Sequence, residues 1–376
     1  MKRVVTAIAW ALLVVAGTMP SAAAAPRPGG TSPTATAAAR KASCTASRAA
    51  FPFPFAKTAR GLRQVDFAQL TVNRGSSWAG TAYRYQDSRI YLITWRAGHR
   101  ASVIASYRYV DVPFDPQYSV TPVGVTPSGA IVAAVEDPQP RDADLGVVPV
   151  KGLYWAHGRK QHLAHRHSWR SYVPTAVTSA GAVVGYAITG STTKPHYWAV
   201  RWARANSAKP HVFADLGRVP ATVTATAEGD VVWTRSDGYA YARLRDGTVH
   251  QLRLGTAASA DYVSRYLYPR LAGSGAVFSS EQDGVHRWTL SGAGAGPIYG
   301  TVVTRYPGFP SAVGPRGDLV LASGRGGRLI TSRGALARLP QQYLRDVGLP
   351  SRAVDAHGTV AYTSRTDRHV HLLRCR

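Results

Sequence analysis

Cysteine, methionine and glutamate are scarce in this sequence of 376 residues, which holds two, two and three of them. It contains no C-x-x-C pair, no H-E-x-x-H, no G-x-S-x-G and no P-loop, so the common signatures of zinc sites, serine hydrolases and nucleotide-binding enzymes are missing. A glycosidase with paired carboxylates would have to rely on aspartates, and nothing in the sequence brings two of them together. These aspartates are Asp111, Asp115, Asp261 and Asp346. The sequence therefore favours a non-catalytic protein without a cofactor, and it leaves the question of catalysis open.

Apolar runs long enough to span a membrane are missing after the N-terminus. The chain starts with Met1-Lys2-Arg3, continues with a mainly apolar stretch over 4–17, and then reads "PSAAAAP". This is the pattern of a cleaved secretory signal peptide, which we place at 1–25. Residues 26–43 are mostly Pro, Gly, Thr, Ser and Ala, which is typical of a flexible leader. We therefore expect a secreted, extracellular protein with no membrane span and one folded domain over 44–376.

Acidic residues are also few, with 20 Asp and Glu against 45 Lys and Arg. Cleavage of the signal would remove Lys2 and Arg3 and leave a net charge of +23. Such an excess favours anionic partners and makes their binding dependent on salt. The alternative is a basic but inert surface in a chain rich in arginine. Nucleic acid is not expected as the partner because no known recognition module is present.

A glycine turn followed by an apolar run recurs seven times. The clearest copy is "AVTSAGAVVGYAI", and the spacing between successive turn glycines is 41 to 54 residues. This period is typical of the four-stranded blades of β-propellers. A proline usually precedes the first strand of each unit, as at Pro122, Pro174 and Pro310. The turn glycines are Gly75, Gly129, Gly181, Gly229, Gly275, Gly317 and Gly358.

The rest of each unit also repeats. A third strand carries aromatic or large apolar residues, as in "YLITWRAG", "WAVRWAR" and "GVHRWTL", and a short fourth strand follows, as in "HVFADLG". β-Branched and aromatic strands with few helical runs predict an all-β protein. Because one unit buries little alone, neighbouring sheets must stack. We predict a seven-bladed β-propeller.

Residues 176–217 carry a family resemblance. "AVTSAGAVVGYAITG", "HYWAVRW" and "FADLG" match the unit of the HAF-type extracellular repeat proteins, and the resemblance extends more loosely over 67–375. It implies a propeller and an extracellular setting, and it implies no catalytic residues.

The last unit ends after its third strand, at Cys375, and the unassigned segment Cys44–Phe55 lies at the other end of the domain. We predict that this N-terminal segment supplies the missing strand of the last blade. Two cysteines in a secreted protein are most simply a disulfide, so Cys44 and Cys375 are expected to lock this seam. Closing so long a loop contributes about 5 kcal/mol in the chain-entropy model.

A binding site is expected where the blades differ. The connections from each fourth strand to the next first strand are long, and nearly all carry arginine beside tyrosine. Tyrosine and tryptophan rings suit sugars, and arginine suits carboxylate or phosphate. Alternatively, each pair braces one blade against the next. The candidate ligand-binding residues are Arg108, Tyr109, Trp169, Arg170, Tyr172, Arg265, Tyr266, Arg305, Tyr306, Tyr343 and Arg345.

Several histidines lie close together in sequence at 157–167, where His165 and His167 would share a strand face. No cysteine or glutamate completes a metal-binding set, so they are expected to be solvated. The leading hypothesis is a monomeric, non-catalytic propeller that binds an anionic or carbohydrate polymer. The alternative is a lyase or hydrolase acting on an acidic polysaccharide, with His165, His167 or Tyr172 moving the proton.

Overall fold

The computed structural model divides the chain into two compact units, Met1–Ala38 and Ala39–Arg376, and all described residues belong to the second. Its described residues form strands and no helix, so none could span a membrane as a helix. The structure describes residues 44–48 and 67–375 except 76, 85–88, 97–100, 109–119, 137–148, 192, 219–221, 236–238, 255–270, 274, 282–283, 295, 305–308, 315, 324–325, 332–335, 340–352, 356 and 364–369.

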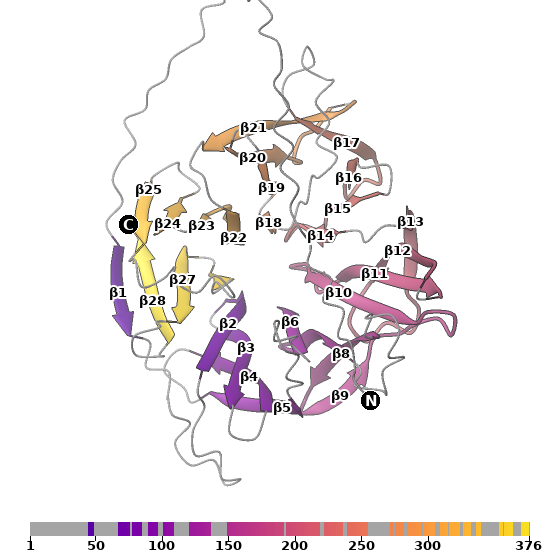
Figure 1. The fold of residues 1–376 in the computed structure, drawn as a ribbon, viewed down its shortest axis with the longest axis horizontal. Coiled ribbons are helices and arrows are strands. Elements are labelled where there is room, and N and C mark those ends of the chain that lie inside the picture. Colours follow the sequence, from indigo (N-terminus) through magenta and orange to yellow (C-terminus); the bar gives the residue numbers. More distant parts are fainter. Residues whose placement is uncertain are drawn as a thin grey trace, which may run out of the picture. The chain divides into compact units, whose positions relative to one another are not determined.

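Three of the sheets have four strands. The first is an antiparallel meander of β2 (Phe67–Arg74), β3 (Ser77–Arg84), β4 (Arg89–Arg96) and β5 (Ser102–Arg108). The second consists of β22 (Phe309–Val313), β23 (Leu319–Ser323), β24 (Gly326–Ile330) and β25 (Leu336–Leu339). The third contains β26 (Ala353–Val354), β27 (Thr359–Thr363) and β28 (Val370–Cys375), and its fourth strand is β1 (Cys44–Arg48). Figure 1 shows β1 in indigo beside β28 in yellow, so the two ends of the domain share one sheet.

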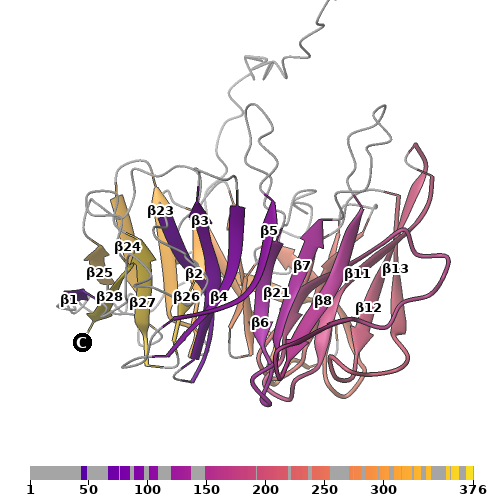
Figure 2. The same ribbon diagram turned by 90° about the horizontal axis from the view of Figure 1, so that it is seen from below.

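Two further sheets each join two such meanders through a short parallel pair. One joins β6 (Val120–Val125), β7 (Ile131–Glu136), β8 (Val150–Ala156) and β9 (Arg159–His162) to β10 (Ser171–Val177), β11 (Val183–Gly190), β12 (Pro195–Trp202) and β13 (His211–Gly217). The other joins β14 (Val223–Ala225), β15 (Val231–Thr234), β16 (Ala240–Arg243) and β17 (Val249–Leu254) to β18 (Leu271–Gly273), β19 (Ala276–Glu281), β20 (Gly284–Thr289) and β21 (Ile298–Thr304). Figure 2 shows β11, β12 and β13 lying side by side within the first of these sheets.

These small antiparallel meanders pack as in a β-propeller. The first strand of each meander contacts the first strand of the next along the chain, from β2 through β6, β10, β14, β18 and β22 to β26, and β26 in turn contacts β2. Because each meander is too small to bury its own apolar face, the core lies between neighbouring sheets. The fold is therefore all-β and of the propeller class, as the sequence predicts.

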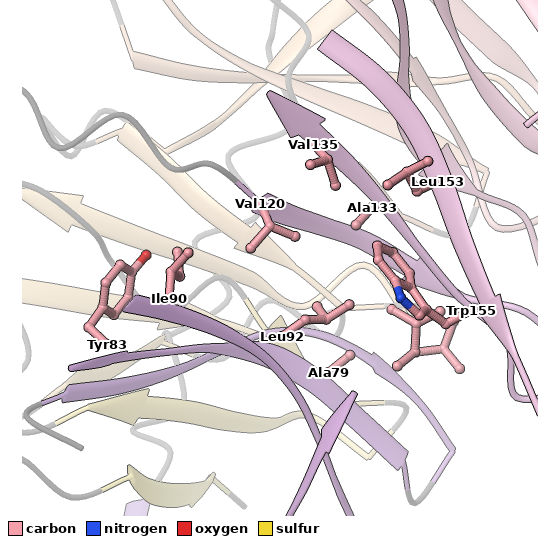
Figure 3. Close-up of a cluster of buried hydrophobic side chains, with 11 residues drawn as sticks. Ala79, Tyr83, Ile90, Leu92, Val120, Ala133, Val135, Leu153 and Trp155 are labelled. Carbon is pink, nitrogen blue, oxygen red and sulfur yellow. The ribbon is translucent and has the colours of Figure 1, made fainter. Parts of the chain in front are cut away.

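The core between β3–β4 and β6–β8 shows how this packing works. Ile90 and Leu92 of β4 point toward Val120 of β6 and toward Leu153 and Trp155 of β8, and all five are buried (Figure 3). In a strand, alternate residues face opposite sides, so the residues between these belong to a different cluster. Trp95, for example, is part of the cluster that includes Ala361 and Val370. Each sheet thus contributes to two cores, one on either face.

All seven predicted turn glycines adopt positive φ, between 56° and 106°. Such angles are open to glycine and strained for other residues. A small polar residue three positions earlier closes several of these turns. Thr126 and Thr178 accept hydrogen bonds through Oγ1 from the amides of Ala130 and Ala182, and Asp355 does the same for Thr359. In these units the turn has a second recurring position besides the glycine, and the sequence analysis identified only the glycine.

The predicted place of the prolines is wrong. Pro122, Pro174 and Pro310 lie within the first strands β6, β10 and β22, and the pairing register shifts directly after each of them. Proline lacks the amide hydrogen that a regular ladder requires, so it is tolerated where a β-bulge interrupts the ladder. These prolines therefore mark β-bulges in the first strands of their meanders.

The glycine turns of different sheets are joined by hydrogen bonds. The guanidinium of Arg74 donates to the carbonyls of Thr178 and Ser179, at 3.4 and 2.6 Å. The amide of Ser179 donates to the carbonyl of Ala227 at 2.7 Å. Burial lowers the pKa of Arg74, but the two carbonyls satisfy its donors. These bonds tie the turn of one sheet to the turns of others.

Candidate functional site

Most of the predicted loop residues lie outside the described residues, so their placement stays a prediction. Arg108 ends β5, where only its backbone is described, and Trp169, Arg170 and Tyr172 are described in full. The predicted residues outside the described part of the chain are Tyr109, Arg265, Tyr266, Arg305, Tyr306, Tyr343 and Arg345.

The rings of Trp169 and Tyr172 pack inside the protein. They are 7% and 2% exposed and belong to the core cluster that contains Trp202. Tyr172 Oη lies 2.8 Å from His162 Nδ1, and the ring of His165 stacks on the ring of Tyr172 at 4.5 Å. These contacts fit the bracing role that the sequence left open, since little of either ring remains for a ligand.

The predicted strand that would place His165 and His167 on one face is absent. β9 ends at His162, and both histidines lie in the irregular segment that leads to β10. The described residues contain no group of three His, Cys, Asp or Glu side chains that could hold a metal ion.

Arg170 precedes β10 and carries a positive charge that the described residues do not neutralise. Its Nε and Nη2 are buried and have no hydrogen-bond partner among them. It lies close enough to Tyr197 to affect that phenol: burial raises the pKa of Tyr197, and the charge of Arg170 opposes this rise. A guanidinium with no counter-charge among the described residues adds positive potential at this end of β10.

The sequence reading missed a stretch without carboxylates. Residues 145–214, which span β8 to β13, contain nine Lys and Arg, six His and no Asp or Glu. The stretch could have been found by plotting charge along the chain, because the overall excess of basic residues hides where it is concentrated. It begins after Asp144 and ends at Asp215.

Seven of the nine Lys and Arg side chains of this stretch are exposed. All four side chains of β9 are exposed, as are His165, His167 and the basic residues near the end of β12. The indole of Trp202 donates to the carbonyl of Ala164 at 2.6 Å, so the end of β12 lies against the segment that follows β9. We call the exposed cations of these elements the basic surface: Arg159, Lys160, Arg166, Lys194, Arg201, Arg204 and Lys209.

Little neutralises the basic surface. The ion pair observed beside it is that of His196 with Asp215, at 2.7 Å, and Asp215 lies one residue beyond the acid-free stretch. Arg166 lies 5.8 Å from the centroid of the Trp169 ring, a cation–π contact that leaves its charge in place. Charged side chains on β9 also keep an edge strand from pairing with another chain. Edge protection accounts for Arg159 and Lys160 on β9, but not for the basic residues of the stretch that lie outside this strand.

No family model matches the chain, and no curated protein matches it. Among solved structures, the chain is similar to a prolyl endopeptidase (14% identity, TM-score 0.45), with 73% of this chain and 42% of that one covered. The β-propeller domain of the Trilobed protease from Pyrococcus furiosus is 9% identical over 83% of this chain and 93% of that one, with a TM-score of 0.46. The β-propeller domain of Cps50 (Swd1) from Myceliophteria thermophila is 12% identical over 83% and 97%, with a TM-score of 0.45. Since every one of these TM-scores is below 0.5, the account of the site rests on the chain's own residues.

Proposed function

We propose that the protein is a secreted, extracellular, non-catalytic β-propeller that binds an anionic polymer, such as an acidic polysaccharide. The basic surface is the binding face, and the arginine- and tyrosine-bearing connections extend it. The observation that carries the proposal is the run of 70 residues without a carboxylate across two neighbouring meanders, with seven of its nine Lys and Arg side chains exposed. A polymer with many negative charges gains from each cation that it neutralises, because counterions are released.

The same proposal includes seven blades and closure by the N-terminal strand. The recurrence of the turn glycines supports seven units, and the antiparallel pairing of β1 with β28 supports completion of the last one. Closure matters for binding because the basic surface spans two meanders, and its cations keep their spacing only if the sheets stay packed. The predicted signal at 1–25 and the resemblance of 176–217 to extracellular repeats support the location.

The experiment compares two triple variants with equal loss of charge. One carries Arg159→Gln, Arg201→Gln and Arg204→Gln, which removes cations from the basic surface. The control carries Arg316→Gln, Arg338→Gln and Arg374→Gln, which removes three exposed arginines from other sheets. Binding to an immobilised polyuronate is measured at several salt concentrations.

We expect the first variant to bind at least about tenfold more weakly than the wild type at low salt, with a smaller slope of log K against log salt. The control should stay within about threefold of the wild type. Equal losses in the two variants would show that only net charge matters, and binding that is independent of salt would refute the electrostatic account.

The alternative function is a lyase or hydrolase for an acidic polysaccharide, with arginine neutralising a uronate and a tyrosine or histidine taking the proton. Its supporting observation is the 2.8 Å contact of Tyr172 Oη with His162 Nδ1. The burial of Tyr172 speaks against it, since a substrate would have to displace core packing. Release of unsaturated sugars, followed by ultraviolet absorbance, would establish this alternative.

A further inference from the structure

A small pocket lies between the first meander and the turn of the second. It has a volume of about 280 Å³, and it is lined by Ser77, Trp78, Thr94, Trp95, Arg96, Ser102, Val125 and Gly129. The first six come from β3, β4 and β5, Val125 ends β6, and Gly129 lies in the β6–β7 turn. None of these residues belongs to the basic surface or to the predicted loop residues.

Strand pairing places the four polar side chains on one side of their sheet. Ser77 pairs with Arg96 across β3 and β4, and Thr94 pairs with Ser102 across β4 and β5. Residues paired across an antiparallel ladder share a face, and so do residues two apart on one strand, such as Thr94 and Arg96.

That shared face is the one that packs toward the second meander. Leu92, two residues before Thr94, belongs to the core cluster that contains Leu153 and Trp155. The four polar side chains continue this face beyond the core, to the level of the β6–β7 turn. The pocket is thus the polar end of an otherwise apolar contact between two sheets.

The lining selects for a particular chemistry. It offers one guanidinium and three hydroxyl groups and no carboxylate, and both Arg96 and Ser102 are exposed. Arginine pairs with carboxylates through two parallel hydrogen bonds, and hydroxyls pair with the hydroxyls of sugars. A volume of about 280 Å³ suits one sugar ring rather than a chain, since pockets for drug-sized ligands begin at about 300 Å³.

We propose that this pocket binds one sugar acid, a monosaccharide unit that carries a carboxylate. Arg96 holds the carboxylate, and Ser77, Thr94 and Ser102 hold ring hydroxyls. The site goes beyond the proposed function, because it recognises a single unit at a place separate from the polymer-binding surface.

The test measures binding of glucuronate to the full protein by isothermal titration calorimetry, with glucose as the neutral probe. We expect saturable binding of glucuronate and at least about tenfold weaker binding of glucose, because glucose lacks the charge-assisted bonds. Arg96→Gln should weaken glucuronate binding about tenfold, and Thr94→Val about threefold, since one neutral hydrogen bond is lost. Arg338→Gln, an exposed arginine on the fourth strand of another meander and outside the basic surface, should leave it unchanged.

Several results would overturn the proposal: no saturable binding of glucuronate, equal binding of glucose, or equal losses from Arg96→Gln and Arg338→Gln. Circular dichroism of each variant shows whether its fold is intact, and Thr94→Val tests the pocket independently of charge. Polymer binding should be normal in Arg96→Gln, so failure of the pocket and failure of the proposed function give different results.

Discussion

Cys44 and Cys375 lie directly opposite each other in the antiparallel pair formed by β1 and β28. Opposed residues in such a ladder have Cα atoms about 4.5 or 5.5 Å apart, depending on the position in the ladder. Both distances fall in the range that a disulfide bridges. The register places the two cysteines opposite each other where the two ends of the domain meet, and the bond between them stays a prediction.

A variant with Cys44→Ser and Cys375→Ser should be less stable than the wild type. The chain-entropy model gives about 5 kcal/mol as the upper end for so long a loop, and compact unfolded chains reduce it. Chemical denaturation measures the change in the free energy of unfolding, and a thiol titration of the unfolded wild type should find no free thiols.

The control for this prediction is reduction. A reducing agent should lower the stability of the wild type and leave that of the double variant unchanged. Two reactive thiols in the wild type, or equal stability of the two proteins, would show that the seam is held by β1–β28 pairing alone.

Gly300→Ala should destabilise the protein by about 1–3 kcal/mol, the usual cost of overpacking a core. A Cβ at this position would lie 2.6 Å from Cε2 of Trp288, which is fully buried and donates its indole N–H to the carbonyl of Arg253 at 2.8 Å. Trp288 cannot move away without losing that bond. The free energy of unfolding in denaturant measures the effect.

Gly294→Ala is the matched control, because it lies in the same region and a Cβ there meets nothing within 4 Å. It should leave stability within about 0.5 kcal/mol of the wild type. Similar changes for the two variants would mean that β20 and β21 pack more loosely than the structure indicates.

Tyr107→Phe should make the free energy of unfolding fall less steeply as the pH rises above about 10. Burial raises the pKa of Tyr107 to about 12, whereas the ordinary value is 10.0. Between these values the unfolded chain loses the proton and the folded chain keeps it, so the free energy of unfolding falls as pH rises. Removing the phenol removes this contribution, which unfolding curves from pH 9 to 12 would measure.

The same substitution should be neutral or slightly stabilising at pH 7, because Tyr107 Oη is buried with no hydrogen-bond partner among the described residues. Tyr83→Phe is the control, since Tyr83 Oη accepts a hydrogen bond from Thr81 at 3.4 Å and its loss should cost about 1 kcal/mol. A large destabilisation by Tyr107→Phe would indicate a partner for this hydroxyl.

The fold could be predicted from the sequence because each unit of the propeller has the same local pattern of turns and strands. Positive φ is nearly restricted to glycine, so Gly129, Gly181 and their counterparts mark the turns wherever they occur. Apolar runs rich in β-branched and aromatic residues mark the strands between them. The place of the prolines was predicted wrongly because a β-bulge depends on how a strand pairs with its neighbour. Sequence spacing does not show this pairing, as the bulge at Pro174 illustrates.

The site was harder to predict because burial and proximity depend on packing between sheets. An arginine beside a tyrosine looks the same in sequence whether the ring faces solvent or, like Tyr172, lies in the core. The pocket around Arg96 was missed for the same reason, since its hydroxyls come from three strands and gain meaning only from their register. The acid-free stretch could have been predicted, because it is visible in the sequence alone.

Lysine labelling tests the proposed binding face most directly, because four of the seven lysines lie in the acid-free stretch and the other three lie at or before Lys57. The full protein is acetylated briefly with and without a saturating polyuronate, and each lysine is quantified by mass spectrometry. We predict that the polymer slows acetylation of Lys160, Lys194 and Lys209 and leaves Lys57 unchanged. Equal protection of all lysines, or protection of Lys57 alone, would contradict binding at the basic surface.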